Sequence, residues 1–135
     1  MNREDYDIGY FEWNSKLIIF TVVKPEPNLE DLIDFNEGYQ KIVDEFIEGE
    51  YISVFDATAA KWLDGKGRIE FGKIAKEQEE KYIGRFLIDI IVIPNPILNM
   101  ILKGVNLVSK PKIPQKVFKT RDDALEFAEE EVSKL

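Results

Sequence analysis

Residues 86–96 read FLIDIIVIPNP, and this stretch decides the fold class. Five of the eight residues from 86 to 93 are isoleucine or valine, the β-branched types that favour strands. The run then stops at two prolines that flank Asn95. Asn95 is a good N-cap, and Pro96 suits the first turn of a helix, where its missing N–H would be unpaired anyway. A buried strand that leads directly into a helix from 96 to about 108 indicates an α/β domain with parallel strands.

The same alternation continues on both sides of this stretch. Upstream, residues 51–55 form a short, mostly apolar run that ends at Asp56, which is typical of a second buried strand. Residues 68–82 lie between the two strands and have apolar side chains at helical spacing. Downstream, residues 117–118 predict a last short strand, and Thr120 is the expected N-cap of a C-terminal helix.

The N-terminal third predicts a hairpin followed by a helix. Residues 11–13 and 17–23 flank a short polar link, and two prolines end the second strand. Asn28 is the expected N-cap of the following helix, which closes at Gly49. The predicted order is therefore β-β-α-β-α-β-α-β-α, in a mixed, mostly parallel sheet with helices packed on it. No linker or repeat interrupts residues 1–135, so we predict a single domain.

The composition excludes several kinds of chemistry. The chain has neither histidine nor cysteine, so it has no disulfide, no Ser-His-Asp triad, no Cys-His pair and no zinc site of the ordinary kinds. We predict no metal and no cofactor. Asp56 and Asp64, which flank the loop after the strand at 51–55, are the best remaining candidates for catalysis. They more simply hold a turn and begin a helix, and we predict that the protein is not an enzyme.

The net charge of −8 argues against binding to nucleic acid. Within this acidic chain, residues 90–121 carry six cations and no acid. We define the basic patch as Lys103, Lys110, Lys112 and Lys116. An acidic N-terminal segment and the lack of any long apolar run predict a cytoplasmic protein without stable membrane insertion.

The helix expected at residues 97–108 is more apolar than packing on a sheet requires. Eight of its twelve residues are apolar, and they fall on every side of the helix. Three explanations of this excess are open. Neighbouring elements cover the helix, the helix forms a subunit interface, or it lines an apolar ligand groove. The basic patch beside it suits an anionic head group or an acidic partner, unless it is simply solvated. The candidate interface residues are Ile97, Leu98, Met100, Ile101, Leu102 and Val105.

Four short motifs carry a family resemblance. They are VFDAT at 54–58, DGKG at 64–67, IVIPNP at 91–96 and TRDDAL at 120–125. Together with the element order, they make the chain similar to the STAS superfamily, in particular its SpoIIAA-like branch. The resemblance covers nearly the whole chain and implies a hairpin followed by alternating helices and strands.

The resemblance does not extend to the phosphorylation switch of that superfamily. In phosphoregulated members, the first serine of an Asp-Ser-Ser-Gly motif accepts a phosphate from a partner kinase. Gly65 stands at that position here and Lys66 follows it, so the phosphoacceptor is absent. Thr58 is a weak substitute, and an ordinary turn threonine is the simpler interpretation. The branch is also related in fold to CRAL-TRIO lipid-binding domains.

Three functional hypotheses follow. The leading one is a non-catalytic STAS-like regulatory or protein-interaction module, which binds a protein partner or self-associates as a homodimer through residues 97–108. The alternative is a carrier or sensor of an apolar anionic small molecule, such as a lipid or fatty acid. The weakest is an enzyme that uses Asp56 and Asp64.

Overall fold

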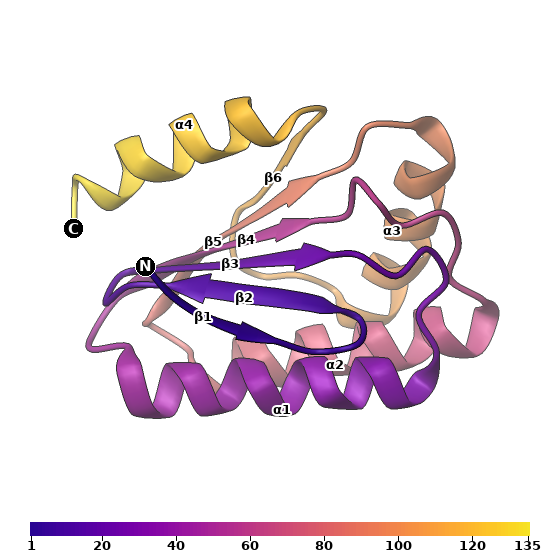
Figure 1. The fold of residues 1–135 in the computed structure, drawn as a ribbon, viewed down its shortest axis with the longest axis horizontal. Coiled ribbons are helices and arrows are strands. Elements are labelled where there is room, and N and C mark those ends of the chain that lie inside the picture. The colour runs from indigo at the N-terminus through magenta and orange to yellow at the C-terminus, as the bar shows by residue number, and fades with distance from the viewer.

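The computed structural model describes residues 1–135, which form one six-stranded sheet and four helices (Figure 1). The strands lie side by side in chain order. They are β1 (Asn2–Asp5), β2 (Gly9–Trp13), β3 (Leu17–Val22), β4 (Tyr51–Asp56), β5 (Phe86–Val92) and β6 (Gln115–Phe118). The helices are α1 (Leu29–Phe46), α2 (Gly65–Lys81), α3 (Pro96–Ser109) and α4 (Arg121–Val132). The predicted mixed α/β fold is confirmed, with one additional strand at the N-terminus.

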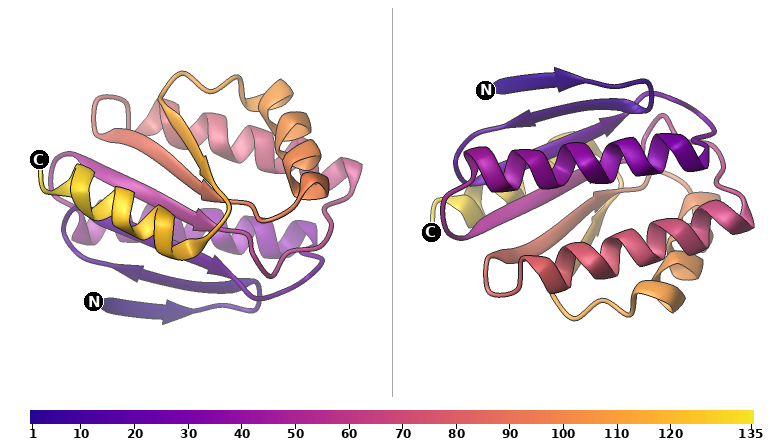
Figure 2. Two further views of the ribbon diagram at one scale, coloured as in Figure 1. Left: turned by 90° about the horizontal axis from the view of Figure 1, so that it is seen from above. Right: turned by 90° about the horizontal axis from the view of Figure 1, so that it is seen from below.

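The sheet is antiparallel at one side and parallel at the other. β1, β2 and β3 pair antiparallel, whereas β3, β4, β5 and β6 pair parallel. Each parallel connection is a helix, and crossovers of one hand place successive helices on one face of a sheet. Figures 1 and 2 show this arrangement: α1 and α2 cover one face, α3 lies beside α2 at one end, and α4 covers the opposite face. None of the four helices combines the length and hydropathy that a bilayer crossing requires.

All four helices begin at caps that the sequence supplies locally. The side chains of Asn28, Asp64, Asn95 and Thr120 accept backbone N–H bonds from three residues further along, at 2.7 to 3.3 Å. At α1, Asp31 completes a capping box by accepting from the Asn28 N–H at 2.9 Å. Because each cap needs only residues within one turn, the helix starts can be predicted from sequence.

Strand β1 is the element that the sequence pattern does not predict. Its residues are polar and have low strand propensity. It pairs with β2, from Asn2 opposite Trp13 to Asp5 opposite Tyr10, and the Arg3 guanidinium stacks 3.9 Å from the centre of the Tyr10 ring. An exposed edge strand is held mainly by its backbone ladder and needs no alternating apolar pattern. Its charged side chains also discourage pairing with another chain.

Two apolar cores lie on opposite faces of the sheet. The larger one, between the sheet and helices α1 to α3, contains most of the buried aromatic rings. The smaller one lies under α4, where Ala124 and Ala128 are fully buried against aliphatic side chains of β3, β4 and β5. Alanines let α4 approach the sheet closely, whereas large rings separate α1 and α2 from it. The thicker layer on the aromatic side is where the candidate site lies.

Candidate functional site

A largely apolar cavity lies between the sheet and helices α1, α2 and α3. Its volume is about 120 Å³, which is many times the space that one water molecule needs. β3, β4 and β5 contribute its floor, α1 and α2 its roof, and α3 one side wall. Of its 25 lining residues 19 are hydrophobic, so most of its surface offers no hydrogen bond. A cavity of this kind favours an apolar occupant.

Aromatic rings build much of the cavity wall. Phe35 of α1 packs against Phe55 of β4 at 5.5 Å and Phe71 of α2 at 5.9 Å between ring centroids. Space remains beside these rings because several lining positions are occupied by small side chains. These small residues are Ser53, Ala57, Ala60 and Ala75. Larger side chains there would fill the cavity, since protein interiors otherwise pack without voids.

One row of polar side chains crosses the cavity floor. Ser53 of β4 is the register partner of Asp89 on β5, and Asp89 is the partner of Gln115 on β6. All three line the cavity, as does Asn106 of α3. Asn106 Nδ2 donates to Gln115 Oε1 at 2.9 Å, which joins the helix to the edge strand. We call Ser53, Asp89, Asn106 and Gln115 the polar end of the cavity.

Asp89 is the charged group of this polar end and has no cationic partner. No lysine or arginine lines the cavity, and Asp89 takes part in no ion pair. Burial raises the pKa of the Asp89 carboxyl to about 7, and the negative charge of Glu79 adds to this, against a smaller opposing effect of the Gln115 amide. The side chain is nevertheless not fully shielded, because it faces the cavity rather than packed atoms. Asp89 is therefore a carboxyl group that changes charge near neutral pH.

The two tyrosines nearest this end do not compensate the charge. The hydroxyls of Tyr39 and Tyr51 share a hydrogen bond of 2.7 Å, so each is already engaged. Burial raises the pKa of both phenols above the ordinary tyrosine value. They therefore stay neutral through the range in which Asp89 titrates.

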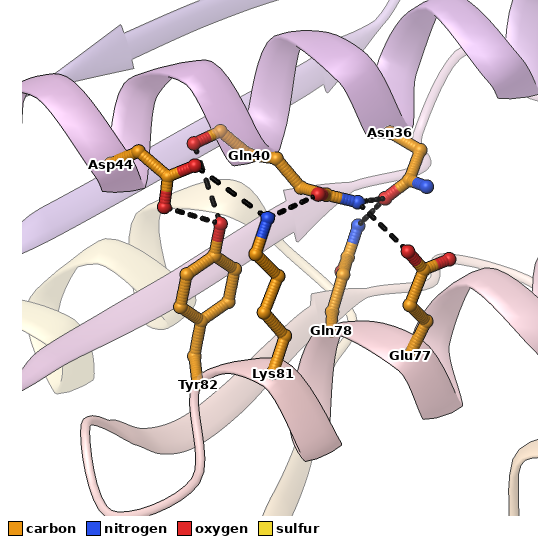
Figure 3. Close-up of polar contacts among 7 residues, drawn as sticks. All are labelled: Asn36, Gln40, Asp44, Glu77, Gln78, Lys81 and Tyr82. Atoms are coloured by element: carbon orange, nitrogen blue, oxygen red, sulfur yellow. Dashed lines mark hydrogen bonds and ion pairs between the residues drawn. The ribbon is translucent and has the colours of Figure 1, made fainter.

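Polar bonds between α1 and α2 hold the roof of the cavity together (Figure 3). Gln78, which also lines the cavity, donates from Nε2 to Asn36 Oδ1 at 3.1 Å. Gln40 donates to the same oxygen at 3.1 Å, and the Tyr82 hydroxyl donates to Asp44 Oδ1 at 2.9 Å. This seam fixes the two helices over the floor, and the cavity is therefore bounded by well-connected elements.

Helix α3 divides the candidate interface residues between two sides. Leu98, Ile101 and Val105 are buried and line the cavity, and half-buried Leu102 lines it as well. The remaining two, Ile97 and Met100, are more than half exposed on the outer face, where Leu107 is also exposed. The apolar residues of this helix thus fall into two groups: one lines the cavity, and the other is exposed on the outer face. We call the exposed group, Ile97, Met100 and Leu107, the outer stripe.

The basic patch lies outside the cavity. Lys103, Lys110, Lys112 and Lys116 are all exposed, and none of them forms an ion pair. The loop between α3 and β6 is held by Glu79, whose Oε1 accepts the backbone N–H groups of Lys112 and Ile113 at 3.0 and 2.9 Å. The lysine side chains therefore remain available at the surface.

The loop after β4 has a structural network rather than an open carboxylate. Asp56 is buried and pairs with Arg121 of α4 at 2.9 Å. Its other oxygen accepts from both the backbone N–H and the hydroxyl of Thr58. Arg121 also donates to Thr21 at 2.7 Å. The hydroxyl of Thr58, the weak phosphoacceptor candidate, is thus already donated to a carboxylate.

Asp64 and Gly65 lie at the other end of this loop. The Asp64 carboxylate caps α2, and Gly65 is the first residue of that helix, exposed and with open space around it. Asp64 and Asp56 share no contact that would join them, and neither lines the cavity. Each of the two carboxylates proposed for catalysis is therefore engaged in a structural contact of its own, outside the cavity.

Trp62 and Leu63 are neighbours in the same loop, but they differ in how far their side chains are exposed to solvent. Leu63 is buried, whereas Trp62 lines the cavity and is still 43% exposed, so its indole lies at the mouth. The Arg68 guanidinium lies 4.7 Å over the indole ring, and both Lys61 and Trp62 donate backbone N–H bonds to the Pro25 carbonyl. These contacts hold the rim of the cavity.

The polar end of the cavity is what sequence reasoning missed. The available signal was an acidic residue, Asp89, in the middle of the most apolar strand of the chain. A buried unpaired acid is rare enough to indicate a functional position. Ser53, Asn106 and Gln115 gave no comparable signal, because polar residues of these types are common in strands and helices.

Comparison with known proteins supports the fold. No protein-family model matches the sequence, and no similarity to a curated protein is significant. The structure is similar to that of an uncharacterised protein of the DUF3478 family from Shewanella loihica PV-4, described as having a SpoIIAA-like fold. The TM-score is 0.58 with 14% sequence identity, and the match covers 94% of this chain and 90% of the other. The SpoIIAA-like fold expected from the motifs is thereby confirmed.

Proposed function

We propose that this chain is a non-catalytic binding domain that holds a small, mostly apolar molecule in the cavity under α2 and α3. One observation carries the proposal: a cavity of about 120 Å³ with aromatic walls and a single polar end. Pockets that bind small ligands combine a mostly apolar lining with a few placed polar groups. The four small side chains that keep the space open support a binding role over a packing defect.

The chemistry of the lining supports binding rather than catalysis. Catalysis by paired carboxylates, as in glycosidases, needs a second acid within reach, and Asp89 is the only carboxylate that lines the cavity. The lining also bears on the charge of the ligand. An anionic head group inside the cavity would face Asp89 without any cation, so the cavity favours a neutral or cationic molecule over the fatty acid expected from the basic patch.

Filling the cavity should weaken binding of a small ligand. Leucine in place of Ala75 on the roof extends into the space, and we expect it to weaken binding of benzyl alcohol at least about tenfold while retaining the fold. Chemical-shift titration by NMR measures this affinity. The matched control is Ala59→Leu, on an exposed loop position outside the cavity, which should bind as the wild type does. Equal affinity of both variants, or no binding to the wild type, would contradict the proposal.

Self-association is a second candidate function, carried by a different observation. Ile97, Met100 and Leu107 recur at helical spacing and expose an apolar stripe on the outer face of α3. We propose that a second copy of the chain covers this stripe. The buried residues Leu98, Ile101 and Val105 are not part of this surface, because they are committed to the cavity wall.

The oligomeric state tests this second candidate. If the outer stripe is an interface, Met100→Asp should shift the protein to monomer in sedimentation equilibrium. The free energy of unfolding of the variant monomer should stay within about 1 kcal/mol of the wild-type monomer's. Ile83→Asp is the control, because Ile83 is 81% exposed in the turn between α2 and β5, at the opposite end of the molecule (Figure 1). If the wild-type protein stays monomeric at high concentration, the self-association hypothesis is wrong.

A further inference from the structure

The polar end of the cavity contains a carboxyl group, Asp89, that faces no cation of the protein. Around Asp89, α2 contributes Glu79, α1 contributes Tyr39 and β4 contributes Tyr51. One of these groups is acidic, and the other two are phenols bonded to each other. Helix α3 and strand β6 contribute only amides, from Asn106 and Gln115. The surroundings of Asp89 thus contain one other acid, two phenols and two amides but no cation.

The two amides bond to each other, and the Gln115 amide also gives the Asp89 carboxylate a weak stabilising contact, which lowers its pKa slightly. Asn106 donates to Gln115 at 2.9 Å, and Gln115 donates back to Asn106 at 3.4 Å. Neither amide carries a charge, and the Asp89 carboxyl and the Ser53 hydroxyl both line the open space with acceptor oxygens. What this end lacks is therefore a hydrogen-bond donor with positive charge.

We propose that the cavity binds an amphiphilic amine, with its apolar body among the aromatic rings and its ammonium group paired with Asp89. The inference rests on the proposed function and names the ligand class. An ammonium group has three donors and no acceptor, which matches a carboxylate beside a hydroxyl. A charged hydrogen bond of this kind is stronger than a neutral one, and its strength increases where water is excluded.

Desolvation of the two charged groups affects how strongly the cavity binds an amine. Removing an ammonium ion from water is unfavourable unless a buried opposite charge compensates it. In this cavity the carboxylate has already lost most of its hydration on folding, so only the ligand has to be desolvated on binding. The aromatic lining adds favourable contacts to the apolar body and attracts cations near ring faces. A neutral ligand of the same shape gains the apolar contacts but not the ion pair.

The pH dependence follows from the charge of Asp89. An ammonium ligand pairs with the ionised carboxylate, so binding should weaken as pH falls through the pKa of about 7. From pH 8 to pH 5 the ionised fraction falls about 100-fold, and the affinity for an amine should fall by a similar factor. An alcohol of the same shape should change little over this range.

Three ligands of nearly equal shape test the proposal: benzylamine, benzyl alcohol and benzoate. By calorimetric or NMR titration at pH 8, we expect benzylamine to bind at least about tenfold tighter than benzyl alcohol, and benzoate to bind weakest. The Asp89→Asn variant should remove the preference for the amine, whereas Glu45→Gln, an exposed acid on α1, should leave it intact. The comparison of pH 8 with pH 5 tests the same point on the unaltered protein, independently of how any variant folds.

The outcomes separate this inference from the function beneath it. If benzyl alcohol binds as tightly as benzylamine, or if the amine affinity does not change with pH, the amine inference is wrong and the binding function stands. If none of the three ligands binds, both are wrong. A preference for benzylamine over benzyl alcohol that survives in Asp89→Asn would also overturn the assignment, because the ammonium would then lie elsewhere.

Discussion

Asp89→Asn is expected to stabilise the protein, and to do so more strongly at pH 8 than at pH 5.5. In the folded protein the pKa of Asp89 is about 7, whereas an unfolded chain has an ordinary aspartate pKa of about 3.9. The folded state thus binds the proton more tightly. The contribution of the protonated carboxyl to stability is complete below about pH 4 and is lost as pH rises towards 7. Asparagine, which is neutral at every pH, does not have this loss.

The expected difference is large for a single substitution. A difference of about three pKa units corresponds to roughly 4 kcal/mol of unfolding free energy at pH 8, and to about half of that at pH 5.5. Urea denaturation at the two pH values measures it. Glu45→Gln serves as control and should stay within about 0.5 kcal/mol of the wild type at both. A variant that is less stable than the wild type at pH 8 would show that Asp89 is ionised and well solvated there.

Phe35→Ala should be among the most destabilising core substitutions. Phe35 is 4% exposed and packs against five other rings, with centroid distances from 4.7 to 6.1 Å. Its loss removes contacts that hold α1 on the sheet and enlarges the neighbouring cavity. We expect a loss of about 3 to 5 kcal/mol in unfolding free energy, measured by thermal or urea denaturation.

Phe46→Ala is the matched control for this prediction. Phe46 is on the same helix and is 44% exposed, with one aromatic neighbour, Trp13, at 5.3 Å. Its truncation should therefore have less than half the effect of Phe35→Ala. Similar losses at the two positions would mean that the aromatic cluster is not the centre of the core.

The interface hypothesis changes once the faces of α3 are known. From sequence alone, Leu98 and Leu102 are natural positions for a disruptive aspartate. In the structure both line the cavity, so a charge there would affect folding and ligand binding at once. Substitution at exposed Met100 separates self-association from these effects.

The ligand hypothesis changes for a similar reason. The cationic segment at 90–121 is close in sequence to the apolar helix, which favoured an anionic ligand. In the structure, the lysines of the basic patch are exposed at the surface and do not line the cavity. The charged residue that lines the cavity is an acid, Asp89. Proximity along the chain therefore does not indicate which charge a ligand inside the cavity would meet, and binding of an anionic group at the basic patch stays a prediction.

The sequence by itself determined the elements and their order. Strand propensity at 86–93, caps at Asn28, Asp64, Asn95 and Thr120, and the absence of histidine and cysteine are all local or compositional features. They depend on residues within about one helical turn, so they can be read without knowing what lies nearby in space. With the four motifs, they were sufficient to predict the SpoIIAA-like fold.

Only the tertiary structure decided what the elements enclose. Ser53, Asp89 and Gln115 meet because strands far apart in the sequence pair in one register, and no local pattern encodes that register. The same holds for the edge strand β1, for the two faces of α3 and for the pKa of Asp89, which depends on burial by three helices and the sheet. The isoleucines of the strand at residues 86–93 indicate the fold from sequence alone. The one acid of this strand, Asp89, is the group on which the proposed ligand site depends. That second role became visible only when the neighbours of Asp89 were known, because burial and the absence of a cation are properties of the packed chain.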